Sequence, residues 1–142
     1  MFHRLSRLAA AALVCLPLIA AAEGPTLQVT IVGADPATGT VEISLFNSEE
    51  DFLKNAYLQQ RCEPAEDGSC TVRFTLIKDS DCAIVAVHDA NDNKKLDNGF
   101  LGFGAESFAY SNGASNPLFG RASFDDAKIT VSGEMEIEID LD

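Results

Sequence analysis

The sequence predicts a mainly β protein, an antiparallel β-sandwich of six to seven strands with one short helix. Three observations predict this class. Several short runs alternate apolar and polar residues, which is the period of strands with one buried face. Turn-forming residues separate these runs at spacings typical of sandwiches. A helix cap followed by an apolar stripe occurs in one segment of the chain.

The chain begins with the three parts of a secretory signal peptide. Arg4 and Arg7 precede an apolar run that ends in three alanines, the last of them Ala22. This run is shorter than the roughly 20 residues that span a bilayer, so it is typical of a cleaved signal. We therefore expect residues 1–22 to be removed and the protein to be periplasmic or secreted.

The chain is acidic, with a formal net charge of −12 at pH 7, and removal of the two leader arginines makes the remainder more acidic still. Phosphates of nucleic acids and anionic lipid surfaces would repel such a protein, whereas cations are natural partners. The length suits one ordinary domain. We therefore expect residues 23–142 to form a single β-sandwich domain with no membrane span and no nucleic-acid partner.

Three half-buried strands are predicted where apolar residues alternate, in residues 26–33, 39–46 and 71–77. The turn sequence Asp35–Gly39 lies between the first two, so we expect them to pair as an antiparallel hairpin. The run Ala83–Val87 is continuously apolar, which predicts a central strand covered on both faces.

The helix is expected from Glu49 to about Leu58. Ser48 can cap its first N–H groups, and an apolar stripe that includes Phe52 would cover the second face of the central strand. The tail predicts two strands around Ser132-Gly133. In the last strand apolar side chains point inward, and an acidic row typical of a solvated edge points outward: Glu134, Glu136, Glu138 and Asp140.

Three cysteines follow the leader, and an oxidising compartment favours disulfide pairing. Cys62 and Cys70 flank a polar, turn-rich loop, whereas Cys70 and Cys82 begin consecutive strands and would lie at opposite ends of a sheet. The sequence therefore predicts a structural Cys62–Cys70 disulfide with Cys82 unpaired. Redox catalysis is disfavoured because the chain has no C-x-x-C motif.

A calcium-loop pattern directly follows the apolar strand. Oxygen-bearing groups recur at alternate positions, as hard cations require, but a lysine replaces the turn glycine and the loop has no closing glutamate. A ligand from outside the loop is therefore needed, and weak Ca²⁺ binding is predicted. The alternative is a turn in which Asp and Asn cap one another without metal. The expected ligands are Asp89, Asn91, Asn93, Lys95 through its backbone carbonyl, Asp97 and Glu106.

Four stretches in and after this loop form the successive parts of one longer pattern. They are His88-Asp89 with the Asn/Asp positions after it, Gly99–Gly102, Phe108–Asn112 and Ser123–Ala127. Together they resemble a family of secreted bacterial proteins with domain of unknown function 2141, over roughly residues 27–141. That family is similar to transthyretin-like and other small sandwich domains of the cell envelope. The resemblance implies a compartment and an architecture, and it assigns no reaction.

These features lead to three hypotheses for the function, each from a different class. The first is a non-catalytic periplasmic module, stabilised by calcium, that binds an envelope protein or glycan through residues 89–111. The alternative is a small periplasmic hydrolase that uses His88, Asp89 and Glu106, with a serine nucleophile at Ser111 or Ser123. The chain lacks the G-x-S-x-G nucleophile motif, which makes the hydrolase the second choice. A third interpretation is a structural domain that calcium only stabilises.

Overall fold

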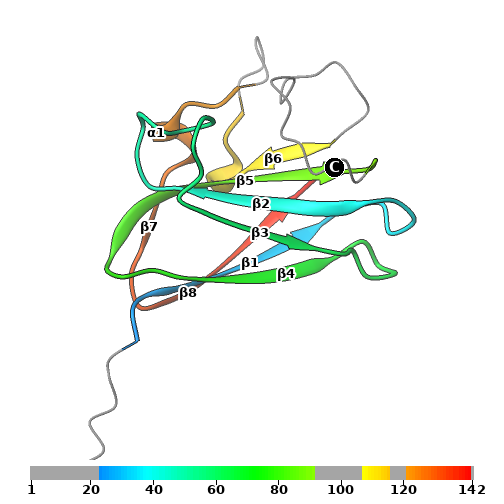
Figure 1. Cartoon of the computed structure of the whole chain (residues 1–142), viewed down its shortest axis with the longest axis horizontal. Helices are drawn as coiled ribbons and strands as arrows, with labels where there is room; N and C mark the ends of the chain where they lie inside the picture. Colours follow the sequence, from blue (N-terminus) through cyan, green and yellow to red (C-terminus); the bar gives the residue numbers. More distant parts are fainter. Residues whose placement is uncertain (1–22, 92–106, 116–120, 142) are drawn as a thin grey trace, which may run out of the picture.

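The computed structural model describes residues 23–91, 107–115 and 121–141, and these form a two-layer β-sandwich (Figure 1). The predicted fold class is therefore confirmed. The signal peptide predicted for residues 1–22 lies outside the described residues, and within the described residues no helix is long and apolar enough to cross a membrane. One sheet has three strands in the order β4 (Cys70–Thr75), β1 (Thr26–Val32) and β8 (Glu134–Asp140).

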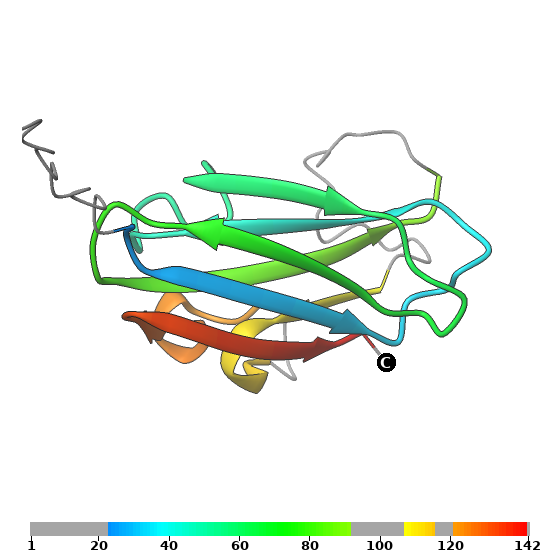
Figure 2. The same cartoon turned by 90° about the horizontal axis from the view of Figure 1, so that it is seen from below.

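The second sheet has five strands. Four of them lie in the order β3 (Leu58–Cys62), β2 (Thr40–Phe46), β5 (Ser80–Asp89) and β6 (Phe108–Tyr110), and β7 (Ile129–Val131) pairs with the first residues of β5. A four-residue helix, α1 (Phe124–Ala127), packs against the outer face of this sheet (Figure 1), and the three-stranded sheet lies in front in the view from below (Figure 2).

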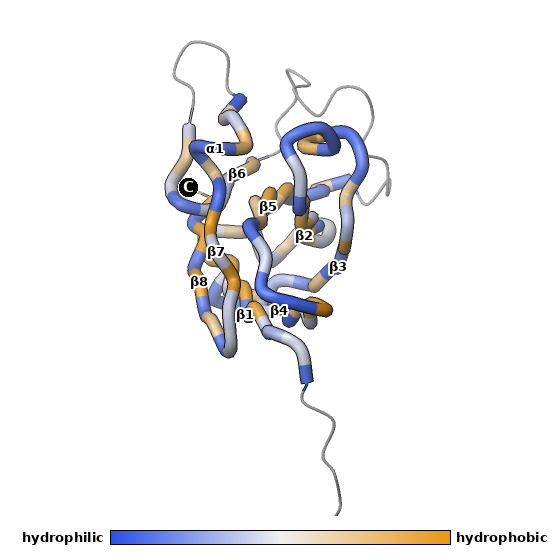
Figure 3. Tube along the Cα trace, turned by 90° about the vertical axis from the view of Figure 1, so that its left-hand side faces the viewer, coloured by the Kyte–Doolittle hydropathy of each residue, from blue (hydrophilic) through white to orange (hydrophobic). Residues whose placement is uncertain are grey.

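The main core fills the space between the two sheets. Alternate residues of each strand point into it, and hydrophobic residues lie along the strands while the connections are largely hydrophilic (Figure 3). Phe74 is 1% exposed and is the largest fully buried side chain. In β8 the acidic side chains lie outside and the apolar ones inside, as the alternation predicted.

The hairpin predicted between the first two strands is wrong. β1 pairs with β4 and β8, whereas β2 pairs with β3 and β5, so the Asp35–Gly39 turn crosses from one sheet to the other. β1 is also parallel to β8, in an otherwise antiparallel pair of sheets. Turn residues specify that the chain reverses, but they do not specify which strand becomes the partner.

The helix predicted from Glu49 to Leu58 is also wrong. This segment forms turns, and β3 begins at Leu58. The Ser48 hydroxyl does accept a hydrogen bond from the N–H of Asp51 at 3.3 Å, but Leu53 adopts a positive φ of 61°, which ends the helical geometry after one turn.

The second face of β5 is covered as expected, although by other elements. Phe52 from the turn segment meets Phe46 of β2, Tyr110 of β6 and Phe124 of α1, with ring centroids 5.4, 6.3 and 5.8 Å apart. This aromatic cluster lies over Ala83 and Val85, so the apolar part of β5 is buried on both sides. The prediction of a central strand is confirmed.

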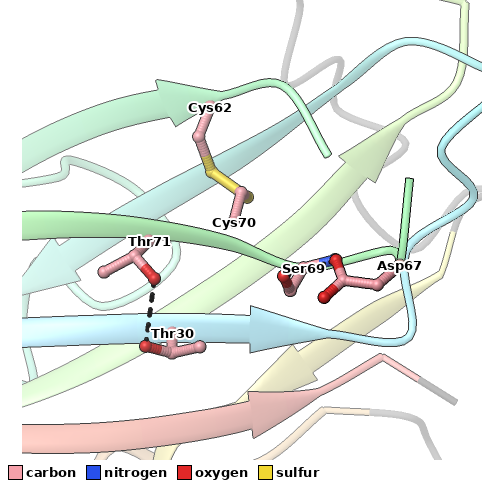
Figure 4. The surroundings of a disulfide bond; sticks show 6 residues. All are labelled: Thr30, Cys62, Asp67, Ser69, Cys70 and Thr71. Atoms are coloured by element: carbon pink, nitrogen blue, oxygen red, sulfur yellow. Dashed lines mark hydrogen bonds between the residues drawn. A yellow bond between two sulfur atoms is a disulfide. The ribbon is translucent and has the colours of Figure 1, made fainter. Parts of the chain in front are cut away.

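The disulfide between Cys62 and Cys70 is confirmed (Figure 4), and Cys82 has no disulfide partner. The bridge joins the end of β3 to the beginning of β4, and these strands belong to different sheets. It therefore connects the two layers along one side of the sandwich. The side-chain amide of Gln60 on β3 also donates to the carbonyl of Arg73 on β4 at 2.5 Å, which adds a second link on the same side.

Candidate functional site

Three charged side chains from neighbouring strands meet on the outer face of the five-stranded sheet. Register places Arg61 of β3 opposite Glu42 of β2, and Asp89 of β5 opposite Thr40, which precedes Glu42 by two residues on β2. Arg61 forms a salt bridge with Glu42, and its Nη1 lies 3.6 Å from Oδ2 of Asp89. Glu42, Arg61 and Asp89 are called the charged cluster below.

The carboxylates of the charged cluster are buried. Glu42 is 5% exposed and Asp89 is 6% exposed, whereas the Arg61 side chain is 30% exposed. Burial raises the pKa of Glu42, the Arg61 charge opposes this, and the nearby Asp89 charge raises it further. Gln59 donates its side-chain amide to Oε1 of Glu42 at 2.6 Å and to the Ser44 hydroxyl at 3.0 Å. The charges of the cluster therefore neutralise one another in part, and ion pairs and hydrogen bonds fix the positions of its side chains.

His88 and Asp89 are neighbours in sequence but point to opposite faces of β5, because side chains alternate along a strand. His88 is 5% exposed and lies opposite Val41, a residue of the core. Its Nε2 donates to the Thr38 carbonyl at 2.7 Å, since a carbonyl can only accept. The structure therefore does not bring the imidazole and the Asp89 carboxylate together.

The end of β5 is fixed from two sides. On one side, the connection before β2 approaches the end of β5 so closely that a Cβ on Gly39 would lie 1.8 Å from the Asp89 carbonyl oxygen. On the other side β6 pairs with β5, and the N–H of His88 donates to the Ser107 carbonyl at 2.9 Å. The segment 90–107 therefore begins and ends at the same end of the five-stranded sheet, on the neighbouring strands β5 and β6.

Among the predicted calcium ligands, only Asp89 and Asn91 belong to the described residues. Asp89 ends β5 and takes part in the charged cluster, and Asn91 is exposed just beyond the strand. Within the described ranges no three His, Cys, Asp or Glu side chains gather as a metal site would require. The other predicted ligands lie outside the described residues: Asn93, Lys95, Asp97 and Glu106.

Both serines considered as nucleophiles support local structure. The buried Ser111 hydroxyl accepts from the N–H of Ile84 at 2.8 Å and donates to the Ala127 carbonyl at 2.6 Å. The Ser123 hydroxyl accepts from the N–H of Asp126 at 3.1 Å and caps α1. Neither serine contacts His88 through any of these bonds.

A surface depression of about 300 Å³ lies at the opposite end of the sandwich from the charged cluster. Residues 23–26 line it together with Asp79, Gly133 and Glu134, where β1, β5 and β8 begin. Asp89 is the last residue of β5, so the whole ten-residue strand separates the two places. The depression therefore has no part in the charged cluster.

Residues 29–139 match a family described as an uncharacterized protein conserved in bacteria, DUF2141. The chain belongs to the DUF2141 family. The match covers every strand of this DUF2141 domain in whole or in part, including the strands that carry the charged cluster. No curated protein and no solved structure matches the chain.

The sequence interpretation found Asp89 but missed its partners in this DUF2141 domain. Glu42 occupies an outward position of β2, where an acidic residue is unremarkable in a solvated face. Arg61 reaches it only because β3 pairs with β2, and the segment before β3 had the features of a helix. In the sequence, the one sign of the Glu42–Arg61 ion pair was a single basic residue, Arg61, in a short polar run before Cys62.

Proposed function

We propose that this chain is a non-catalytic, exported binding module that contacts an envelope protein or glycan through residues 89–111. The observation that supports this most directly is that both ends of the segment 90–107 are fixed, because they continue from the paired neighbouring strands β5 and β6. Long connections held by a rigid sheet are where binding residues concentrate in β-sandwich proteins. Export is supported by the signal-peptide pattern of residues 1–22.

The arrangement of the described residues favours binding over hydrolysis. The hydrolase alternative needs His88 beside a carboxylate, but His88 points toward the core and donates to Thr38, while Asp89 faces Arg61. The hydroxyls of Ser111 and Ser123 are already used in local hydrogen bonds. A module of this kind contributes a surface, and any chemistry belongs to its partner.

Calcium is proposed as a stabilising ion at the beginning of the same segment, with Asp89 as one ligand. Weak sites of extracellular modules have dissociation constants of about 10⁻⁴–10⁻³ M. At a free concentration tenfold above such a constant, binding adds about 1.4 kcal/mol to the free energy of unfolding. The melting temperature should then rise by several degrees, as a linkage effect for a domain of this size.

The calcium arm is tested by melting curves in calcium and in magnesium. Asp89→Asn should lose the calcium-specific rise, whereas Glu138→Gln, on the outer face of β8, should retain it. Equal shifts in the two metals, together with no heat of binding in calorimetry, would leave the Asp/Asn turn without metal and overturn this part of the proposal.

The binding arm is tested by capture from an envelope extract and from purified cell-wall glycan. The wild-type protein is compared with a variant whose residues 93–105 are replaced by a glycine-serine linker, and with Glu138→Gln as the matched control. Retention of a defined protein or glycan should disappear only in the linker variant. Equal retention by all three proteins would show that the segment is not the binding surface.

A further inference from the structure

β8 lies at one edge of the three-stranded sheet and pairs with β1 along one side only. Backbone hydrogen bonds of 2.8 and 3.0 Å join it to β1 through Gly133, just before the strand, and Leu141, just after it. Alternate residues of a strand direct both of their backbone groups to the same side, so the odd-numbered residues of β8 bond to β1. The N–H and C=O groups of Glu134 and Glu136 therefore point away from β1.

These outward groups are unpaired. Within the part of the chain that the structure describes, the backbone N–H and C=O groups of Glu134 and Glu136 have no hydrogen-bond partner. A row of such groups on an edge strand is a template for another strand. Protective features are absent from β8 itself, because its seven residues pair with β1 without a bulge and include no proline or lysine. The edge is therefore able to accept an added strand.

The apolar side of β8 is incompletely covered in the first half of the strand. Met135 and Ile137 point toward the core but stay partly exposed, whereas Ile139 in the second half is 3% exposed. A strand added at this edge would place its own alternate side chains beside Met135 and Ile137 and remove them from water. Residues 134–137, called the open edge below, thus combine unpaired backbone groups with uncovered apolar surface.

The outer side of the open edge is acidic. Glu134 and Glu136 are exposed, and no basic side chain among the described residues pairs with either; Glu136 accepts a hydrogen bond from the Gln28 amide at 3.3 Å. The surface depression of about 300 Å³ reaches Glu134. Glu23 and Asp79 also line this depression, and its described lining includes no lysine or arginine. Cationic side chains are therefore the ones that fit this side of the edge.

A second copy of the chain does not fit the open edge. Two such edges paired antiparallel would place glutamates opposite glutamates in every register that keeps the apolar sides together. Like charges directly opposite one another destabilise a strand pair. The acidic row thus protects the edge against pairing with itself, whereas it attracts a basic strand.

We propose that the open edge accepts an extended, basic segment of a partner polypeptide as a fourth strand of the three-stranded sheet. Alternate lysine or arginine side chains of this segment pair with the two glutamates, and apolar side chains between them cover Met135 and Ile137. In this mode of recognition backbone hydrogen bonds supply affinity and side chains supply specificity. The inference is independent of the proposed function, because the open edge begins at the end of the sandwich opposite to Asp89.

The probe is a capped peptide of about six residues, the usual length of a strand, in which lysine and valine alternate. Calorimetry measures its binding to the protein expressed from the full sequence. The control peptide has the same composition with its lysines grouped at one end, so it carries equal charge but cannot place lysines along one side of a strand. The alternating peptide should bind more tightly. Equal binding of the two peptides, or no binding of the alternating one, overturns the inference.

Glu136→Pro blocks the edge without breaking the sheet. The N–H of Glu136 makes no bond to β1, and proline is tolerated where the N–H of an edge strand faces outward. Glu136→Gln is the matched control, because it removes the same charge and keeps the N–H. The control should weaken peptide binding about two- to fivefold, the value of one cross-strand charge pair, and the proline variant about tenfold further. Equal affinities of the two variants would place the peptide elsewhere and overturn the inference.

Hydrogen exchange on the wild type tests the same contact without any substitution. In the free protein the amides of Glu134 and Glu136 should exchange rapidly, whereas those of Met135 and Ile137, which bond to β1, should be protected. Saturation with the alternating peptide should protect the two glutamate amides as well. No added protection contradicts strand addition, even where the peptide binds. A dimeric wild type whose glutamate amides are protected without peptide would show that a second copy occupies the edge, which also overturns the inference.

Discussion

Cys62 and Cys70 join the edge strands of two different sheets, and their Cα atoms are 6.1 Å apart. The two cysteines are eight positions apart in the sequence, so the bridge closes a short loop. It also links one layer of the sandwich to the other. Its removal should therefore affect the packing of the two layers on this side as well as the loop itself.

The double variant Cys62→Ser/Cys70→Ser should lower the free energy of unfolding by about 2–3 kcal/mol, the entropic value for so short a loop. Urea unfolding with and without reductant provides the measurement. The wild type in reductant should lose the same amount, and the double variant should be insensitive to reductant. A wild type that is equally stable in both conditions would contradict the stabilising role.

Cys82 should resist alkylation in the folded protein. Its side chain is fully buried, and burial raises the pKa of the thiol to about 11, so the reactive thiolate is scarce at pH 8. Iodoacetamide at pH 8 followed by mass spectrometry should leave Cys82 unmodified. The control is the same reaction in denaturant, where modification should be complete; rapid labelling of the folded chain would show that β5 is accessible.

Glu42 should make stability depend on pH. Burial raises its pKa above the ordinary value of 4.5, so the folded protein holds this proton more tightly than the unfolded chain. The resulting stabilisation is fully present below about pH 4.5 and is lost as pH rises through the folded pKa. The difference in unfolding free energy between wild type and Glu42→Gln should therefore fall from pH 4 to pH 7.

Urea titrations at several pH values measure this difference. Glu138→Gln, on the outer face of β8, is the control for general effects of removing one negative charge. A difference for Glu42→Gln that stays constant, or grows with pH, would mean that the burial of Glu42 is compensated by its partners.

Two glycines offer a matched pair for the approach of the β1–β2 connection to β5. Gly39 and Gly133 have nearly equal positive φ angles of 61° and 58°, but a Cβ on Gly133 would meet nothing within 4 Å. Gly133→Ala should cost about 1–2 kcal/mol from backbone strain alone. Gly39→Ala should cost at least about 3 kcal/mol, because backbone must move away from Asp89. Equal losses of stability for the two variants in thermal unfolding would show that the β1–β2 connection moves away from β5 at no cost in free energy.

Local patterns predicted most of the strands, since alternation and burial act within a few residues. The tail around Ser132-Gly133, the buried run Ala83–Val87 and the disulfide followed from such patterns and are confirmed. Strand partners did not follow, because pairing depends on contacts between distant residues. The first two strands have good turn chemistry between them and still belong to different sheets.

The same limit applies to the candidate site. Asp89 was identifiable because its loop pattern is local in sequence. Its contact with Arg61 depends on the order β3-β2-β5, and the apparent helix between β2 and β3 hid that order. Leu53, whose positive φ ends the turn, gave no warning, because leucine rarely adopts this conformation.

The parallel pairing of β1 with β8 has a consequence for how the molecule folds. Thr26 lies opposite Glu134, so the middle strand of the three-stranded sheet receives one of its neighbours only from the last strand of the chain. Contacts between residues so distant in sequence slow folding, because a long loop must close before they stabilise anything. We therefore expect folding to be slow for the size of the domain, with β1 exposing one hydrogen-bonding edge until the C-terminal strand arrives.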